Sequence, residues 1–259
     1  MAPAHHDVVR REFARQADGF GHRGSLFAAR SIADWIDAGA RLAPGDLALD
    51  AGGGAGDLSR SLADRARQFV VADLTDAMRD VGRDAAEAAG VDNVLFVRAA
   101  LEDLPFPDRS FDCVLCRFVV HHLADPALAL AELRRVCRPG GRVVVADLVC
   151  LDGAIAARHN ELERLRDASH TVALTEDGLV AAVGAAGLAV ASADRYEHHP
   201  DLEAWIARAH TPAGAADELR AAFAAEAEGG PATGLRAERD ADGRVAMRQR
   251  WVRVVATPI

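Results

Sequence analysis

The chain contains 259 residues, half of them hydrophobic, so it is long enough for one large α/β domain with a small additional lobe. Its formal net charge of −9 argues against duplex DNA or an anionic membrane surface as a partner, and we expect no nucleic-acid binding. No stretch reaches the roughly 18 consecutive apolar residues of a membrane span, and the four cysteines do not form a disulfide pattern. We therefore expect a cytoplasmic protein without a leader sequence.

The first part of the chain alternates between predicted helices and strands. Helices are expected at residues 5–17, 25–38, 57–67, 75–89 and 126–137. Strands are expected from about residue 47 and at residues 68–73, 93–97, 111–116 and 142–149. The strands are continuously apolar, which is typical of a parallel sheet covered by helices on both faces.

The second part of the chain is predicted to be mainly helical. Helices are expected at residues 153–169, 175–186, 201–210 and 214–227, with a strand at residues 188–197 and a last strand at residues 244–257. No helix directly precedes the last strand, so it can return antiparallel to its neighbours.

The glycine-rich loop after the first strand predicts a site for a nucleotide-sized ligand. Gly52, Gly54 and Gly56 follow Asp50 at alternating positions and open a helix, so the backbone can approach a ligand closely. The G-x-G-x-G spacing is tighter than the dehydrogenase pattern, and an acid before the loop would repel a pyrophosphate. Asp73, at the end of the second strand, can accept hydrogen bonds from both hydroxyls of a ribose.

Five segments in order resemble the motif series of class I S-adenosylmethionine-dependent methyltransferases, in the ubiquinone/menaquinone-methyltransferase-like group. They are residues 47–56, 71–75, 104–108, 110–112 and 138–141, so the resemblance covers about residues 45–150. It implies an α/β, Rossmann-like sheet of seven strands, mostly parallel with an antiparallel last strand, with helices on both faces and a small helical lid. We expect the lid at residues 1–44 and a methyltransferase domain at residues 45–259, with helical insertions at about 152–172 and 200–230.

The same resemblance implies S-adenosylmethionine as cofactor and S-adenosylhomocysteine as product. It places the three glycines near the cofactor, Asp73 on the ribose and Leu74 on the adenine. The expected cofactor-binding residues are Asp50, Gly52, Gly54, Gly56, Asp73, Leu74, Met78, Ala100, Leu101, Glu102 and Arg117. Arg117 is expected to meet the cofactor's carboxylate or an acidic substrate, with a surface ion pair as the alternative. Ala100 stands where the group has an aspartate that binds the adenine amino group, so we expect a weaker or differently arranged adenine contact.

A polar segment after the fifth strand is the candidate acceptor site. The expected substrate-binding residues are Phe20, Asn160, Glu163, Arg166, Asp167 and His170. Helical spacing places most of the polar ones on one face, which is either a solvated face with ion pairs or a wall of the pocket. A metal site that also uses His121 or His122 is a weaker alternative, and we expect no metal.

His121 and His122 follow the fourth strand at the edge of the sheet where ligands bind. A histidine there can take a proton from a hydroxyl nucleophile, although both side chains can equally be packing residues. Phe13 and Gln16 are expected in the lid, together with Phe20. Three further residues, Trp205, Arg208 and His210, lie in the late helical insertion and can close the other side, with core packing the favoured role for Trp205.

These patterns together predict a methyltransferase that acts on a small molecule at oxygen or carbon, in secondary metabolism or on a quinone-like acceptor. The alternative is a protein that binds S-adenosylmethionine but catalyses a step other than methylation, or acts as a binding module. A nicotinamide dehydrogenase is a third and weaker alternative, because of the loop spacing. We expect a monomer or a homodimer.

Overall fold

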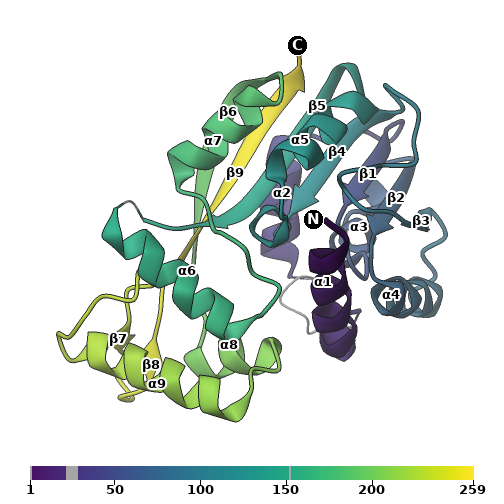
Figure 1. Cartoon of the computed structure of the whole chain (residues 1–259). Helices are drawn as coiled ribbons and strands as arrows, with labels where there is room; N and C mark the ends of the chain where they lie inside the picture. The colour runs from purple at the N-terminus through teal and green to yellow at the C-terminus, as the bar shows by residue number, and fades with distance from the viewer. Residues whose placement is uncertain (1, 22–28, 152) are drawn as a thin grey trace.

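The computed structural model describes residues 2–21, 29–151 and 153–259. One sheet contains seven strands in the order β3-β2-β1-β4-β5-β9-β6 (Figure 1). The strands are β1 Leu47–Ala51, β2 Gln68–Asp73, β3 Val94–Arg98, β4 Phe111–Arg117, β5 Cys137–Val149, β6 Leu188–His198 and β9 Gln249–Pro258. From β3 to β5 in this order, each strand is parallel to its neighbour. The strand β9 lies between β5 and β6 and is antiparallel to both. The predicted seven-stranded sheet with an antiparallel last strand is therefore confirmed.

Helices cover both faces of this sheet. One face packs against α2 (Arg30–Ala40) and α3 (Asp57–Ser61), and the other against α5 (Pro126–Val136) and α7 (Glu176–Ala185). The strand β4 contributes to both layers, because Cys113 packs with the α2 and α3 side chains and Cys116 with those of α5 and α7. Residues three apart on a strand face opposite sides of the sheet. The two cysteines of this C-x-x-C sequence are therefore free, buried thiols on opposite faces.

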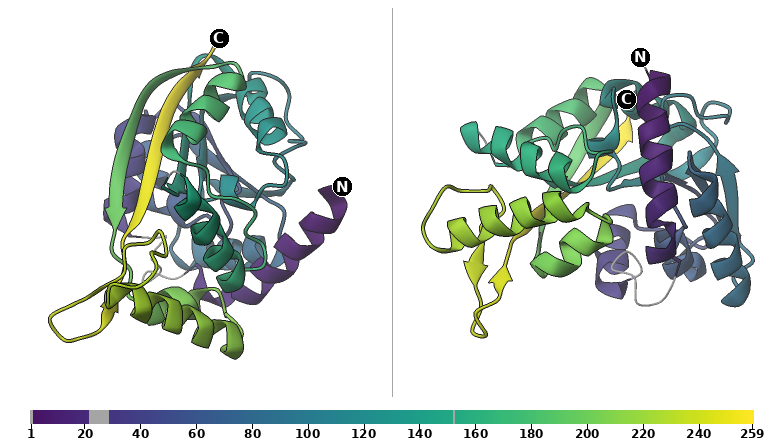
Figure 2. Two further views of the ribbon diagram at one scale, coloured as in Figure 1. Left: turned by 60° about the vertical axis from the view of Figure 1, so that its left-hand side comes forward. Right: turned by 60° about the horizontal axis from the view of Figure 1, so that its bottom comes forward.

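A second hydrophobic core lies beside the sheet. It is built from α6 (Ala154–Arg166), α8 (Leu202–Arg208), α9 (Ala213–Ala227) and a hairpin of β7 (Glu238–Arg239) and β8 (Val245–Ala246). Its largest fully buried side chains are Trp205 and Phe223, whose rings lie 5.5 Å apart. Figure 2 shows these helices grouped apart from the layers that cover the sheet. We call α6, α8, α9 and the β7–β8 hairpin the helical lobe.

The remaining helices are α1 (Ala2–Gln16) and α4 (Asp76–Ala88), which contact each other, with short 3₁₀ turns at Ala17–Gly19, Ala63–Arg65 and Val120–His122. Whereas α2 packs on the sheet, α1 crosses in front of the carboxyl ends of the strands (Figure 1). Within the described residues, no helix is long and apolar enough to cross a membrane.

Several predicted boundaries are wrong. The strand expected at residues 142–149 begins already at Cys137. The helix expected at residues 57–67 stops at Ser61 and continues only as a 3₁₀ turn. The helix expected at residues 153–169 ends at Arg166, because Asp167 is extended and its carboxylate accepts a hydrogen bond from the Ser169 N–H. The last strand begins at Gln249, since residues 245–246 pair with β7 instead. Residues 25–28 of the helix expected at 25–38 lie outside the described part of the chain, and α2 begins at Arg30.

Candidate active site

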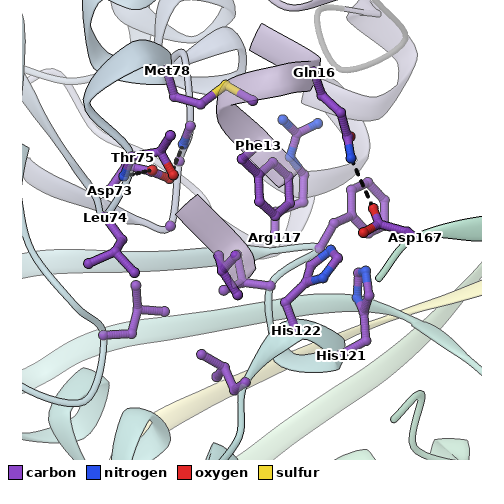
Figure 3. Close-up of a pocket in the computed structure, with 18 of the residues that line it drawn as sticks. Phe13, Gln16, Asp73, Leu74, Thr75, Met78, Arg117, His121, His122 and Asp167 are labelled. Atoms are coloured by element: carbon purple, nitrogen blue, oxygen red, sulfur yellow. Dashed lines mark hydrogen bonds between the residues drawn. The ribbon is translucent and has the colours of Figure 1, made fainter. Parts of the chain in front are cut away.

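A single cavity runs along the carboxyl ends of β1, β2 and β4 and continues to the helical lobe. In parallel α/β sheets ligands bind at this edge, because the loops and helix N-termini there point toward the same space. The sheet supplies one wall, α1 contributes His5, His6, Val9, Phe13 and Gln16, and the lobe contributes the far end. Figure 3 shows side chains from these separate elements directed toward the same space.

The glycine loop and Asp73 form one hydrogen-bonded unit at the edge of the cavity. The Gly54 N–H donates to Oδ2 of Asp73 at 2.9 Å, and the Thr75 N–H donates to Oδ1 at 2.8 Å (Figure 3). Gly52 and Gly54 have φ of +69° and +56°, which favours glycine. A Cβ on Gly54 would meet only the Met78 sulfur, at 3.8 Å, so this backbone is open to the cavity. The unit fits a ligand that carries a ribose.

Asp50 supports the loop from beneath. Its carboxylate accepts a hydrogen bond from the Ser59 hydroxyl at 2.7 Å, and a Cβ on Gly53 would lie 2.6 Å from its Cγ. Burial raises the pKa of Asp50, while the Ser59 hydrogen bond and the charge of Arg117 oppose that rise. The close contact explains why the loop needs a glycine at position 53, which the alternating pattern had not singled out.

Most of the expected cofactor-binding residues line the cavity. These are Asp50, Gly52, Gly54, Asp73, Leu74, Met78, Ala100, Leu101, Glu102 and Arg117. Gly56 is placed differently, since a Cβ there would meet the Phe96 ring at 3.0 Å, so this glycine allows helix and sheet to pack closely. Arg117 lines the cavity rather than the outer surface; burial lowers its pKa, and the charges of Asp50 and Asp57 oppose this.

His121 lies in the cavity wall next to a buried carboxylate. Its Nδ1 is 2.5 Å from Oδ1 of Asp147, and its backbone N–H donates to Oδ2 at 3.1 Å. Asp147 is 2% exposed and lies near the end of β5, the strand beside β4. A carboxylate at Nδ1 requires the proton on that nitrogen, so Nε2 of neutral His121 is the proton acceptor.

His122 lies beside His121 and belongs to a different hydrogen-bonded chain. Its Nδ1 is 3.0 Å from the Ser169 hydroxyl, which donates to Asp167 at 2.5 Å. The other carboxylate oxygen of Asp167 accepts from Gln16 of α1 at 3.1 Å (Figure 3). Burial and the neighbouring His121 lower the pKa of His122 to about 3, so its ring is neutral at physiological pH.

The face of the polar segment after β5 that carries Asn160 and Glu163 is buried, so its interpretation as a solvated face is wrong. Asn160 is 6% exposed and Glu163 is fully buried. Three of the residues expected to bind substrate line the cavity: Phe20, Arg166 and Asp167. The other three are buried behind the cavity wall: Asn160, Glu163 and His170. The helix ends before Asp167, and therefore the expected common face does not extend to His170.

The residues behind the wall hold the wall in place. Oδ1 of Asn160 accepts hydrogen bonds from Nε2 of His170 at 2.7 Å and from the Ala173 N–H at 2.6 Å. Glu163 accepts from Nε of Arg166 at 3.0 Å and from Gln249 at 3.4 Å. These contacts fix the turn behind His121 and orient Arg166 toward the cavity.

Several residues of the cavity and its support were missed in the sequence. They are Gly53, Asp147, Ser169, Gln249 and Trp251. Asp147 carried a signal, because it is an acid near the end of the strand that neighbours the one before His121. Gln249 and Trp251 reach the site only because β9 inserts between β5 and β6, which no local spacing reveals.

The late helical residues divide between cavity and surface. Trp205 is buried in the lobe core, as expected, and also lines the cavity together with Arg208. His210 is exposed and lies 3.5 Å from Asp18. No group of three or more His, Cys, Asp or Glu side chains suited to a metal ion occurs in the described ranges.

The sheet order and the unit of the glycine loop with Asp73 are typical of Rossmann-like α/β proteins that bind a nucleoside. A family model described as "Methyltransferase domain" matches residues 49–145. The chain is 33% identical over 166 residues to the uncharacterized methyltransferase YcgJ of Bacillus subtilis, covering 64% of this chain and 66% of that protein. It is 42% identical over 109 residues to the ubiquinone/menaquinone biosynthesis C-methyltransferase UbiE of Teredinibacter turnerae, covering 40% of this chain and 43% of that protein.

Two crystal structures share the fold over nearly their whole length. The YcgJ structure has a TM-score of 0.80 at 24% identity and covers 89% of this chain and 99% of that chain. A putative methyltransferase from Bacillus halodurans has a TM-score of 0.79 at 25% identity, with coverage of 88% and 100%. The chain belongs to the class I S-adenosylmethionine-dependent methyltransferases, of the type represented by UbiE.

Proposed function

We propose that the protein transfers a methyl group from S-adenosylmethionine to oxygen or carbon of a small, quinone-like or phenolic acceptor. One observation carries this proposal: a single cavity joins the ribose-binding unit of Asp73 to the His121–Asp147 pair. The names of the UbiE relatives, which are C-methyltransferases of ubiquinone and menaquinone biosynthesis, support an acceptor of this kind.

The residues of the sheet edge have the chemistry to hold the cofactor. Asp73 would accept hydrogen bonds from the ribose, the loop at Gly52 and Gly54 would receive the amino-acid part, and Leu74 and Met78 would pack against the base. Arg117 is suited to the cofactor's carboxylate. When bound, S-adenosylmethionine supplies a methyl group on a sulfonium, so the protein mainly has to align the acceptor and exclude water.

His121 is the residue we propose as general base. Asp147 holds its proton at Nδ1, and thus Nε2 can accept the proton of an acceptor hydroxyl as the new bond to oxygen forms. His122 is less suited to this role, because its pKa of about 3 makes it a weak base. Phe13 of α1 contacts His122 edge-on, with the ring centroids 5.0 Å apart. In this proposal α1 is the lid over this part of the cavity.

The test is to incubate the protein with methyl-labelled S-adenosylmethionine and a panel of catechols, quinols and a metabolite extract, and to follow the label by mass spectrometry. We expect label in a small acceptor and equal release of S-adenosylhomocysteine. Calorimetric titration with S-adenosylmethionine and with S-adenosylhomocysteine is the control for a functional cofactor site. Tight binding of both with no label transferred to any acceptor would refute methyl transfer and favour a step other than methylation.

A further inference from the structure

The far end of the cavity, where the helical lobe meets it, is lined by hydrogen-bond donors. Arg166 ends α6, and Trp205 and Arg208 are three residues apart on α8, so they share a face of that helix. The Arg166 guanidinium lies 4.8 Å from the centroid of the Trp205 ring. Guanidinium groups and the indole N–H can only donate hydrogen bonds, and therefore this end of the cavity suits a group rich in acceptors.

The indole N–H of Trp205 is a buried donor without an acceptor. Trp205 is 1% exposed, and its Nε1 has no hydrogen-bond partner within the described part of the chain. A buried polar group without a partner is costly, so such groups usually have one when the protein is in its working state. An indole that lines the cavity can obtain that acceptor from a ligand.

The two nearest acids take part in the protein's own hydrogen bonds, and Glu163 is the ion-pair partner of Arg166. Glu163 accepts hydrogen bonds from Arg166 and Gln249, and Asp167 accepts from Gln16 and from Ser169. Arg208 adds a second cation close to Arg166. Burial and the charge of Arg166 lower the pKa of Arg208 to about 10, against the opposing influence of Glu163. Two guanidinium groups thus line the same end of the cavity.

We infer that Trp205, Arg208 and Arg166 form the binding site for an anionic group, a carboxylate or a phosphate, on the acceptor. This inference rests on the proposed function and names its substrate class. An acceptor that spans the cavity would place its anionic end against the lobe and its nucleophile toward His121. Arginine suits either anion, because its planar fork donates two parallel hydrogen bonds.

The experiment titrates protein saturated with S-adenosylhomocysteine with benzoate, phenyl phosphate and the neutral benzyl alcohol, followed by calorimetry. We expect at least one anion to bind about tenfold or more tightly than the alcohol, as for a charge-assisted hydrogen bond. The tighter of the two anions identifies the source of the charge. Arg208→Gln should weaken anion binding about tenfold, and Arg208→Lys should restore part of it.

Two further variants separate the site from general effects of charge and folding. Arg220→Gln removes the same charge from the exposed face of the same lobe, where Arg220 pairs with Glu203, and should change anion affinity less than about twofold. Trp205→Phe keeps a ring but removes the N–H, and should weaken anion binding while leaving benzyl alcohol unchanged. The inference is overturned if no anion binds, if benzyl alcohol binds as tightly, or if Arg208→Gln and Arg220→Gln behave alike.

Failure of the proposed function looks different from failure of this inference. If no methyl label reaches any acceptor but Arg208→Gln still loses the anion, the anion site stands and methyl transfer does not. If methyl label moves equally well to neutral and anionic acceptors in the unaltered protein, methyl transfer stands and the anion site is refuted.

Discussion

The sheet edge and the helical lobe meet in one cavity but present different kinds of groups to it. At the sheet edge the groups are backbone amides and carboxylates at fixed positions after strands, such as Gly54 and Asp73. In the lobe they are long side chains, such as Arg166, oriented by acids buried behind them. The family model ends at residue 145, before the lobe begins. The family model therefore covers the sheet edge and not the lobe, although the YcgJ crystal structure matches 89% of this chain.

The largest expected effect comes from the boundary between the two regions. His121→Gln should lower the rate of methyl transfer by about 10²–10⁴-fold, the usual contribution of a general base. The affinity for S-adenosylhomocysteine should change little. Single-turnover measurement of label transfer gives the rate, and calorimetry gives the affinity. His122→Gln is the matched control and should cost less; an equal loss in the two variants would contradict the assignment.

Asp73→Asn tests the sheet edge alone. Replacement of the carboxylate removes a charged acceptor from the ribose, so the affinity for S-adenosylhomocysteine should fall about 10–100-fold in calorimetric titration. Asp76→Asn, which alters an exposed carboxylate at the start of α4, should leave the affinity unchanged. If Asp73→Asn also abolished anion binding at the lobe, the two regions would not be independent.

His122 makes stability depend on pH. Its pKa is about 3 in the folded protein against an ordinary 6.5, so below pH 6.5 the unfolded chain binds a proton that the folded chain does not. The free energy of unfolding should therefore fall as the pH falls from about 6.5 toward 3, by up to about 1.4 kcal/mol per pH unit for this group. Urea unfolding at several pH values should give a shallower slope for His122→Asn. The same slope as in the unaltered protein, or an equal change in the exposed His199→Gln, would argue against this prediction.

The smallest expected effect concerns the adenine. Ala100 lines the cavity but offers no side-chain acceptor, so Ala100→Asp should add one hydrogen bond and raise cofactor affinity about three- to tenfold. Calorimetric titration with S-adenosylhomocysteine measures it. An unchanged affinity would mean that the backbone near Leu101 already satisfies the base.

The sheet edge was predictable because its chemistry depends on local spacing. A glycine loop after a strand and an acid at the end of the next strand reach the same edge in any parallel sheet, so Gly54 and Asp73 could be placed without a structure. The packing role of Gly56 could not be predicted, since only the position of Phe96 shows it. The spacing of the glycines predicts a loop that can approach a ligand, but it does not show which side chains pack against each glycine.

The lobe was only partly predictable because its contacts join distant residues. The polar pattern at Asn160 and Glu163 is the same for a solvated face and for a buried network, and burial decides between them. The partners that decide it, such as Gln249, lie far away in the chain. The sequence predicts that Trp205 and Arg208 can close one side of the site. It cannot show that the indole N–H of Trp205 lacks a hydrogen-bond partner, because that depends on packing.

The register of β6 and β9 has a consequence for how this protein can be altered. His198 at the end of β6 pairs directly with Gln249 at the start of β9, so the residues between them leave and re-enter the sheet at one point. Most of the lobe is therefore a single excursion whose two ends are joined by a strand pair. The entropy of closing such an excursion changes only slowly with its length, so a segment of different size can replace it without disturbing the strands. Residues 199–248, which carry Trp205 and Arg208 of the proposed anion site, are thus a natural unit to exchange between relatives to test whether acceptor preference moves with them.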